Sequence, residues 1–333
     1  MSRDMAGKEK IRLGTRGSAL AMVQAREVKA LLEERVPGLE VELVEIATTG
    51  DKRLDIALSS ATSASGGTIE KGLFTKELEN ALLDKEIDIA VHSLKDVPTE
   101  QPESLEVVVT LPREQTSDLL LTKEKTAWQE FPQRAVVATS SERRKWQLLQ
   151  LREDLEIVPV RGNVPTRLRK FLNEEKWSGM VLAQAGLLRL GYLLHADKAF
   201  NEDSLHGDAG WFEHEGEKIF FQSMGDRMPG AAGQGAIAVE CRRNDLRVIS
   251  FLQKIHDETT WECVGMEREI LRRLGGGCQM PLGILAKKNH EGIYRMQAQL
   301  FRMESGKIQM QEGAGEGMNR EAVIAAVAEQ LGI

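Results

Sequence analysis

Apolar and polar positions change periodicity several times within the first 110 residues. Residues 11–13 and 41–46 are short or alternating apolar segments of the kind that form strands, whereas apolar positions between 20 and 32 recur at helical spacing. A further helix is predicted over 74–85, followed by a strand over 87–91. This alternation predicts a largely parallel sheet, and ligands of such sheets bind beyond the carboxyl ends of the strands.

The same alternation returns from about Asp118 onwards. Strands are predicted over 135–138, 156–160 and 179–183, and each is followed by a helix. A second α/β domain is therefore expected.

The pattern breaks down between 201 and 228, a polar stretch with several glycines in which Trp211 and three phenylalanines are embedded. We expect a long loop or a surface insertion here. Its aromatic residues would either pack on the second domain or form a surface for a partner. A strand is predicted to follow over 236–240.

The last ninety residues have a different character. Helices are predicted over about 244–256 and 259–274, followed by alternating segments at 294–301 and 307–311 and by a closing amphipathic helix. Helices combined with a small antiparallel sheet predict an α+β domain.

These patterns together predict the α/β class, with two α/β domains and a small α+β C-terminal domain. The first domain would comprise residues 8–112 and 226–242, and the second residues 117–200. Residues 201–225 would form the insertion or long loop, and residues 244–333 the third domain.

Composition narrows the function classes. A chain of 333 residues is too long for one ordinary core, and no apolar run approaches the roughly 18 residues that cross a membrane. The net charge of −7 and the aromatic content of 5% argue against a nucleic-acid partner. Three cysteines are too few for a disulfide framework and favour a reducing, cytoplasmic location. We expect Cys241 and Cys263 to lie in the core.

Arginines gather where the predicted strands end. One such arginine is usually a solvated surface charge, but guanidinium groups bind carboxylates through paired hydrogen bonds, and a set of them suggests a cleft for a polyanion. Ser140 and Ser141 suit a helix N-cap, whose free N–H groups would add to anion binding. The arginines are Arg16, Arg143, Arg144, Arg161, Arg167 and Arg189.

Lys95 and Asp96 follow another strand, just before a proline. The pair could be a surface ion pair of little energetic value, or Asp96 could stabilise a developing cation and move a proton. His92 lies just after the same strand, and we favour a packed, hydrogen-bonded histidine over a catalytic one.

Cys278 follows three glycines and precedes a proline, so the thiol is expected on a tight turn. It could be a buried small hydrophobe or an attachment point. The Ser-, Thr- and Gly-rich stretch 59–68 could be an irregular loop or a lid with glycine hinges, from which Lys71 would reach a ligand.

The motifs, taken in order, resemble those of the porphobilinogen deaminase family over nearly the whole chain. The run from His92 to Pro98 and the Gly-Cys-Gln turn at 277–279 are the most specific of them. The other matching segments are 15–18, 71–74, 139–144, 161–164 with 166–167, 185–191 and 233–236.

The resemblance implies two domains like those of periplasmic binding proteins and a third that bears the cysteine. It implies a dipyrromethane cofactor joined to Cys278 by a thioether. Four porphobilinogen molecules would be added in turn, each losing ammonia, before hydrolysis releases hydroxymethylbilane. Asp96 carries over as the catalytic carboxylate that stabilises an azafulvene-like cation and assists proton transfer.

The resemblance also implies a set of residues that hold the acetate and propionate groups of cofactor and substrate. No metal is expected, and the chain would act as a monomer. The alternative is a two-lobed anion-binding protein without catalysis, which would need neither Cys278 nor Asp96. The implied binding residues are Arg16, Ser18, Gln24, Lys71, Ser93, Lys95, Thr139, Ser140, Ser141, Arg143, Arg144, Arg161, Gly162, Asn163, Arg167, Arg189 and Gln234.

Overall fold

The computed structural model describes residues 9–48, 75–196, 209–276 and 280–333. Its contacts divide the chain into two compact units. The first unit is Met1–Arg113 with Ala236–Trp261, and the second is Glu114–Gly235 with Glu262–Ile333.

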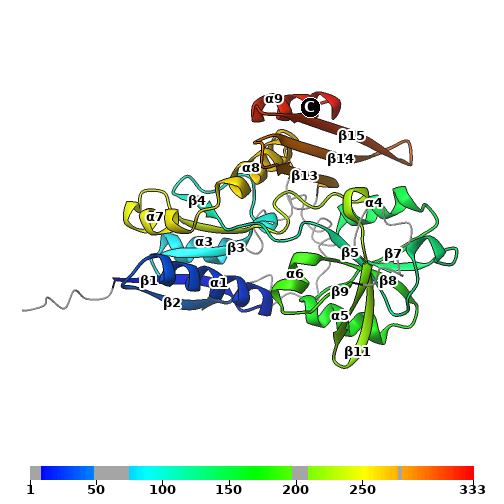
Figure 1. The fold of residues 1–333 in the computed structure, drawn as a ribbon, viewed down its shortest axis with the longest axis horizontal. Coiled ribbons are helices and arrows are strands. Elements are labelled where there is room, and N and C mark those ends of the chain that lie inside the picture. Colours follow the sequence, from blue (N-terminus) through cyan, green and yellow to red (C-terminus); the bar gives the residue numbers. More distant parts are fainter. Residues whose placement is uncertain (1–8, 49–74, 197–208, 277–279) are drawn as a thin grey trace, which may run out of the picture. The chain divides into compact units, whose positions relative to one another are not determined.

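A five-stranded sheet with order β2-β1-β3-β12-β4 forms the centre of the first unit. β1, β2 and β3 run parallel, whereas β12 is antiparallel to both of its neighbours. In Figure 1, α1 lies along β1 and β2, which agrees with their contacts. The elements are β1 (Glu9–Arg16), α1 (Ala19–Arg35), β2 (Leu39–Ile46), α3 (Lys76–Leu83), β3 (Ile89–Ser93), η2 (Leu94–Asp96), β4 (Leu105–Thr110), β12 (Ile237–Arg242), α7 (Leu246–Leu252) and η6 (Gln253–Ile255).

The residues after β12 differ from the expectation that a third domain begins at 244. Val248 and Leu252 of α7 and Ile255 of η6 are buried in the same core as Ile11 and Val239 of the first sheet. The amphipathic pattern identified α7 as a helix, but such a pattern does not say which apolar surface covers it.

The second unit contains a seven-stranded sheet with order β7-β6-β8-β5-β11-β10-β9. β6, β7 and β8 are parallel and β5 is antiparallel to its neighbours, so the first five strands repeat the pattern of the first sheet. The elements are β5 (Asp118–Thr122), η3 (Trp128–Glu130), β6 (Val136–Ala138), α4 (Glu142–Leu151), β7 (Glu156–Val158), α5 (Val164–Asn173), β8 (Trp177–Ala183), α6 (Gln184–Arg189), β9 (His195–Ala196), β10 (Ala209–His214), β11 (Glu217–Ser223) and η5 (Gly225–Arg227).

The prediction of a long loop is wrong for residues 209–223, because β10 and β11 form an antiparallel hairpin. Its two-residue turn is Glu215-Gly216, both with positive φ, as such hairpins require. Phe212 and Phe221 are buried in the core of this sheet, which confirms the packing alternative for these two aromatic residues. A glutamate in the turn, rather than Asn or Asp, hid the hairpin signal.

The end of the chain forms the expected α+β module, with the antiparallel sheet β13-β14-β15. Figure 1 shows α9 lying along β15, and Val323 and Val327 of α9 share a core with Ile284 of β13. The mixed α/β class is confirmed. The elements are α8 (Glu258–Arg273), β13 (Leu282–Lys288), β14 (Tyr294–Glu304), β15 (Lys307–Gly317) and α9 (Arg320–Gln330).

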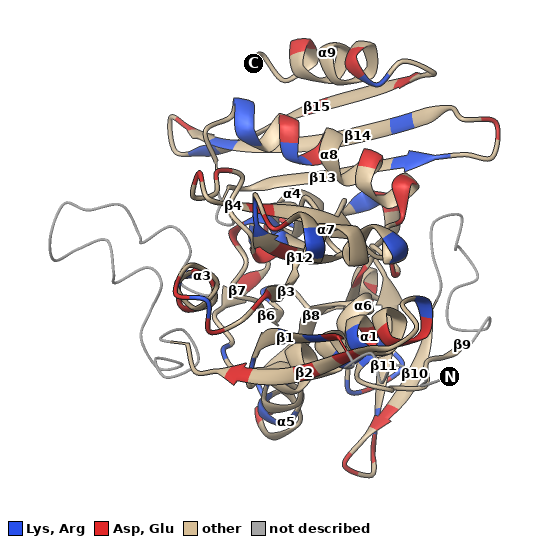
Figure 2. Cartoon of the chain, turned by 90° about the vertical axis from the view of Figure 1, so that its left-hand side faces the viewer, with Lys and Arg blue, Asp and Glu red and all other residues tan. Residues whose placement is uncertain are grey.

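Within the part of the chain that the structure describes, no helix combines the length and apolar character needed to span a bilayer. Acidic and basic residues are interspersed along elements such as α3 and α8 (Figure 2).

Candidate active site

A small cavity of about 80 Å³ lies where β1 and β3 of the first unit end. The two strands are parallel neighbours, so the residues that follow them meet at one edge of the sheet. The lining includes Arg16, Ser18, Gln24, Thr75, His92, Ser93 and Asp96. Five of the predicted site residues are therefore brought together around one cavity.

The start of α1 fixes one wall of this cavity. Ser18 is the N-cap of α1, and its hydroxyl accepts a hydrogen bond from the backbone N–H of Ala21 at 3.3 Å. The amide of Gln24, buried one turn later, exchanges hydrogen bonds of 2.9 and 3.0 Å with the Ser93 hydroxyl. These contacts hold the helix start and the end of β3 at a defined separation.

Asp96 is presented by the single 3-10 turn η2 that directly follows β3. Leu94 in the same turn is buried, and its N–H donates to the carbonyl of Ala236 at 3.0 Å. Lys95 and Asp96 remain partly exposed. The turn is therefore anchored through Leu94, so that the side chain of Asp96 lines the cavity.

His92 is buried and hydrogen-bonded, which confirms the packing part of the sequence interpretation. Its Nε2 lies 3.1 Å from Oε2 of Glu240, and the two side chains are 4% and 1% exposed. The other carboxylate oxygen of Glu240 accepts a hydrogen bond of 2.8 Å from Gln101. The sequence reasoning missed Glu240, although a lone acid within the apolar strand Ala236-Ile237-Ala238-Val239 pointed to a special environment.

In the second unit, two helices begin with side-chain caps next to predicted site residues. Ser141 caps α4, and its hydroxyl accepts a hydrogen bond of 3.4 Å from the N–H of Arg144. Asn163 caps α5, and its side-chain oxygen accepts a hydrogen bond of 2.9 Å from the N–H of Thr166. Gly162 has φ +115°, a conformation that side chains rarely adopt. The loops before both helices are thus fixed by their caps.

Arg143 and Arg144 lie in the interior of the second unit, where both pair with Asp118. Their Nη2 atoms are 2.8 and 2.7 Å from the two carboxylate oxygens, and the side chain of Asp118 is fully buried. Burial alone would raise the pKa of Asp118, but the two guanidinium groups outweigh it and hold that pKa well below its usual range. The single negative charge of Asp118 therefore compensates one of the two positive charges that Arg143 and Arg144 bring into the interior.

Gln234 joins the same cluster. Its side-chain amide donates to the Thr116 carbonyl at 2.7 Å and to Asp118 at 3.0 Å. Asp118 was not predicted as a site residue, although a single acid before three leucines in β5 was a visible signal.

The other arginines of the second unit are less enclosed. Arg161 is half-buried and makes no ion pair with any residue that the structure describes. Arg167 donates to the Gly162 carbonyl at 2.7 Å, and Arg189 donates to the Gly235 carbonyl at 2.9 Å. These contacts fix the orientation of the two guanidinium groups.

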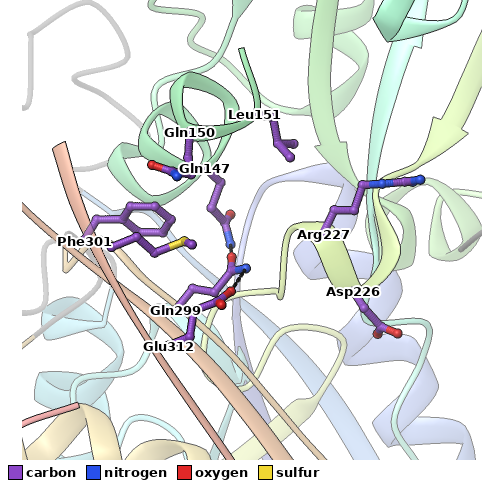
Figure 3. Close-up of a pocket in the computed structure, with 9 residues that line it drawn as sticks. Gln147, Gln150, Leu151, Asp226, Arg227, Gln299, Phe301 and Glu312 are labelled. Atoms are coloured by element: carbon purple, nitrogen blue, oxygen red, sulfur yellow. Dashed lines mark hydrogen bonds between the residues drawn. The ribbon is translucent and has the colours of Figure 1, made fainter. Parts of the chain in front are cut away.

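A larger cavity of about 480 Å³ lies between α4, η5 and the sheet of the C-terminal module. It contains none of the predicted site residues. Figure 3 shows Gln147 and Gln299 pointing toward one another across it, with a hydrogen bond of 3.2 Å. Gln147 also accepts a hydrogen bond of 2.8 Å from Arg143, so this cavity adjoins the cluster formed by Asp118, Arg143 and Arg144.

Two predicted site residues, Cys278 and Lys71, lie outside the described residues. Of the other cysteines, Cys241 and Cys263 are buried, as expected. Burial raises the pKa of the Cys241 thiol to about 12, which disfavours the reactive thiolate.

Two family models match the chain. The model described as porphobilinogen deaminase, dipyromethane cofactor binding domain, covers residues 11–250, and the model described as porphobilinogen deaminase, C-terminal domain, covers residues 261–333.

Curated relatives match over most of their length. A porphobilinogen deaminase of Chloroherpeton thalassium is 39% identical over 98% of this chain and 92% of its own. That of Syntrophotalea carbinolica is 41% identical over 96% and 92% of the two chains, and that of Syntrophomonas wolfei 42% over 83% and 80%.

Among solved structures, the methionine-binding protein MetQ has a TM-score of 0.41 and 14% identity over 78% of this chain and 94% of its own. A likeness this low supports no argument about fold or ligand.

Proposed function

The chain belongs to the porphobilinogen deaminase family, and on that premise we propose which of its residues carry out the family reaction. The enzyme is a transferase that condenses four porphobilinogen molecules with loss of ammonia and releases hydroxymethylbilane. The alternative of an anion-binding protein without catalysis is not favoured by these relatives.

The cofactor of this family is dipyrromethane, whose two rings carry acetate and propionate groups. The donor set fits it, because Arg161 is half-buried without an ion pair to any described residue, and guanidinium groups bind carboxylates through paired hydrogen bonds. The capped starts of α4 and α5 add backbone donors. When bound, the cofactor supplies the ring carbon at which chain growth begins.

We assign Cys278 as the thioether attachment point and Lys71 as a further cation, on the strength of their motifs. The other members of the implied binding set keep that assignment, with one revision. Arg143 and Arg144 use much of their hydrogen-bonding capacity on Asp118, which favours a supporting role in fixing the start of α4.

Asp96 is the proposed catalytic carboxylate. The observation that carries this is its position on the same cavity as Arg16 and Ser18. An ionised carboxylate held there would stabilise positive charge as it develops at the pyrrole nitrogen of porphobilinogen while ammonia leaves. Arg16 and Ser18 would hold the substrate carboxylates and fix the ring against Asp96.

Intact-protein mass spectrometry and turnover test this assignment together. Asp96→Asn should fold, keep the mass of two added pyrrole units and lose on the order of 10²–10⁴ in kcat. Cys278→Ser should lack the added mass. Asp84→Asn, at an exposed position, is the matched control and should leave both readouts unchanged. Near-normal turnover of Asp96→Asn, or an active wild-type enzyme without added mass, would contradict the assignment.

We further propose that the enzyme acts in the cytoplasm as a monomer. The sparse cysteines, two of them buried thiols, support a reducing compartment. Light scattering after size exclusion tests the monomer, and a molar mass of twice 37.1 kDa would contradict it.

A further inference from the structure

The buried pair of His92 and Glu240 has no part in the function assigned so far. Placing a carboxylate in the interior is unfavourable unless it is paired and hydrogen-bonded. Glu240 meets this condition on both oxygens, through His92 and Gln101. Gln101 is in turn fixed, because its side-chain oxygen accepts a hydrogen bond of 3.2 Å from the N–H of Val107. The carboxylate therefore has one defined orientation toward the imidazole.

This orientation determines which ring nitrogen carries the proton. A carboxylate only accepts hydrogen bonds, so with Glu240 in that form we assign Nε2 of His92 as the N–H donor to it. In the neutral imidazole, Nδ1 then holds a lone pair. No residue that the structure describes makes a hydrogen bond to Nδ1, and His92 lines the same cavity as Asp96. A carboxylate that orients an imidazole beside a reaction site is the arrangement that hydrolytic triads use.

The reaction includes a proton transfer that a group of this kind can carry out. In each addition, the bond between the aminomethyl carbon and the protonated nitrogen of porphobilinogen breaks, and neutral ammonia leaves with the electron pair. A carbon–carbon bond forms, and the ring carbon that forms it loses one proton. If Asp96 took that proton, its negative charge would be lost at the moment when it stabilises the cation. A second base leaves Asp96 ionised.

We propose that His92, oriented by Glu240, accepts the displaced proton at Nδ1 and then passes it to the ammonia already released, which becomes ammonium. The inference rests on the proposed function and adds to it a proton-transferring residue. Protons balance, because one leaves the ring carbon and one is taken up by ammonia. His92 begins and ends each addition as neutral imidazole.

Charged groups around His92 come from several elements. Glu240 lies on β12, Glu79 on α3, Arg16 at the end of β1, and Lys95 and Asp96 on η2. Burial raises the pKa of Glu79, with the nearby Glu240 acting in the same direction. Because several charged groups lie near His92, the pH at which activity falls does not by itself identify the responsible group. The loss of activity at low pH (the acid limb) is therefore assigned to His92 by comparing variants.

The tautomer is measured directly by NMR of the holoenzyme labelled with ¹⁵N-histidine. The chain has six histidines, and the His92 signals are those absent from a His92→Gln spectrum. We expect the Nε2–H tautomer at neutral pH, with a shift of the Nδ1 resonance on protonation. An Nδ1–H tautomer would overturn the proposal without reference to turnover.

Turnover supplies the second readout. His92→Gln should keep the cofactor mass and KM within about twofold but lose on the order of 10² in kcat. In wild type, kcat should fall on acidification, because a base must be unprotonated to accept the proton. Glu240→Gln removes the charge that stabilises imidazolium, so this limb should move to lower pH. His290→Gln, at an exposed histidine, is the control and should change neither kcat nor the limb.

These measurements distinguish failure of the proposed function from failure of the role given to His92. A wild type that makes no hydroxymethylbilane refutes the proposed function and the inference with it. An active wild type whose acid limb is unmoved by Glu240→Gln overturns the inference alone. If His92→Gln fails to fold or to hold cofactor, the Glu240→Gln profile and the wild-type tautomer decide. A His92→Gln enzyme with kcat within threefold of wild type also overturns it.

Discussion

Asp118 is a single carboxylate that keeps two guanidinium groups in the interior of the second unit. Arg143 and Arg144 bind both of its oxygens, and Gln234 binds one of them as well. Without this acid, two like charges would face each other in a medium of low dielectric. The stability of the region therefore depends on one side chain far more than an exposed ion pair would suggest.

Asp118→Asn should lower the free energy of unfolding at pH 7 by about 3–5 kcal/mol, because removing one partner leaves buried charges without compensation. Urea unfolding measures this. Glu156→Gln, which breaks an exposed pair with Arg134, is the control and should change little. A loss for Asp118→Asn no larger than the control would contradict the role given to the cluster.

The pH dependence of this difference follows from the depressed pKa of Asp118 in the folded chain. A depressed pKa means that the contribution is fully present above the unfolded value of roughly 3.9 and is lost as pH falls through the folded value. The gap between wild type and Asp118→Asn should thus be constant from pH 7 to 5 and shrink below about pH 4. A gap that widens on acidification would contradict the sign.

At the scale of elements, the start of α5 joins stability to anion binding. Asn163 caps the helix, Pro165 lies in its first turn, and Gly162 provides the positive φ that turns the chain into it. The cap satisfies the N–H of Thr166 but leaves other donors of the first turn for a ligand. The same residue can therefore be tested for both properties.

Asn163→Ala should lower the free energy of unfolding by about 1 kcal/mol through loss of the cap. Asn163→Asp keeps a capping oxygen and should preserve stability, yet its negative charge should reduce the fraction of chains that carry the cofactor mass. Urea unfolding and intact mass separate the two effects. Equal cofactor loading in wild type and Asn163→Asp would argue that this helix start does not contact cofactor carboxylates.

The comparison between pattern and structure shows where local signals suffice. Periodicity identified β6, β8 and α8 almost to their ends, because apolar spacing in these elements follows directly from the face they bury. It missed the β10–β11 hairpin, whose turn lacks the usual residues, and could not assign α7 to a core. The hairpin was missed because its local turn sequence is atypical. The core of α7 could not be assigned because it depends on tertiary contacts.

The candidate site divides in the same way. Strand ends and sheet order place Arg16, Ser18 and Asp96 around one cavity, as the positions of the motifs predicted. Arg143 and Arg144 have the same sequence signature as Arg161, but Asp118 neutralises them. A partner contributed by a strand 25 residues away cannot be read from the arginines alone.

At the scale of the whole chain, the C-terminal module contacts the rest of the second unit through glycine and backbone. The N–H of Ile284 donates to the Gly230 carbonyl at 2.8 Å, and Glu267 of α8 accepts hydrogen bonds of 2.8 Å from Gly233 and Ala286. β13, which makes this contact, begins a few residues after the proposed attachment cysteine. The packing of β13 against α4 therefore influences the position at which the proposed attachment cysteine would hold the cofactor.

Gly283 is the position at which this contact is most sensitive. A methyl group there would lie 2.3 Å from the Gln147 amide and 2.8 Å from the Pro229 carbonyl, and the carbonyl belongs to backbone that cannot rotate away. Gly283→Ala should lower the free energy of unfolding by about 1–3 kcal/mol through overpacking. Because Gln147 also accepts a hydrogen bond from Arg143, displacement of the Gln147 side chain should also disturb the cluster around Asp118.

Gly265→Ala makes the same chemical change in the same module and should have the opposite effect. Gly265 lies on the exposed side of α8 with open space around it, and replacing an exposed helical glycine by alanine stabilises by about 0.5–1 kcal/mol. Urea unfolding of the two variants decides the sign. If Gly283→Ala also stabilised the chain, the close contact between β13 and α4 would not exist in solution. Limited proteolysis of the wild type would then be expected to release the C-terminal module.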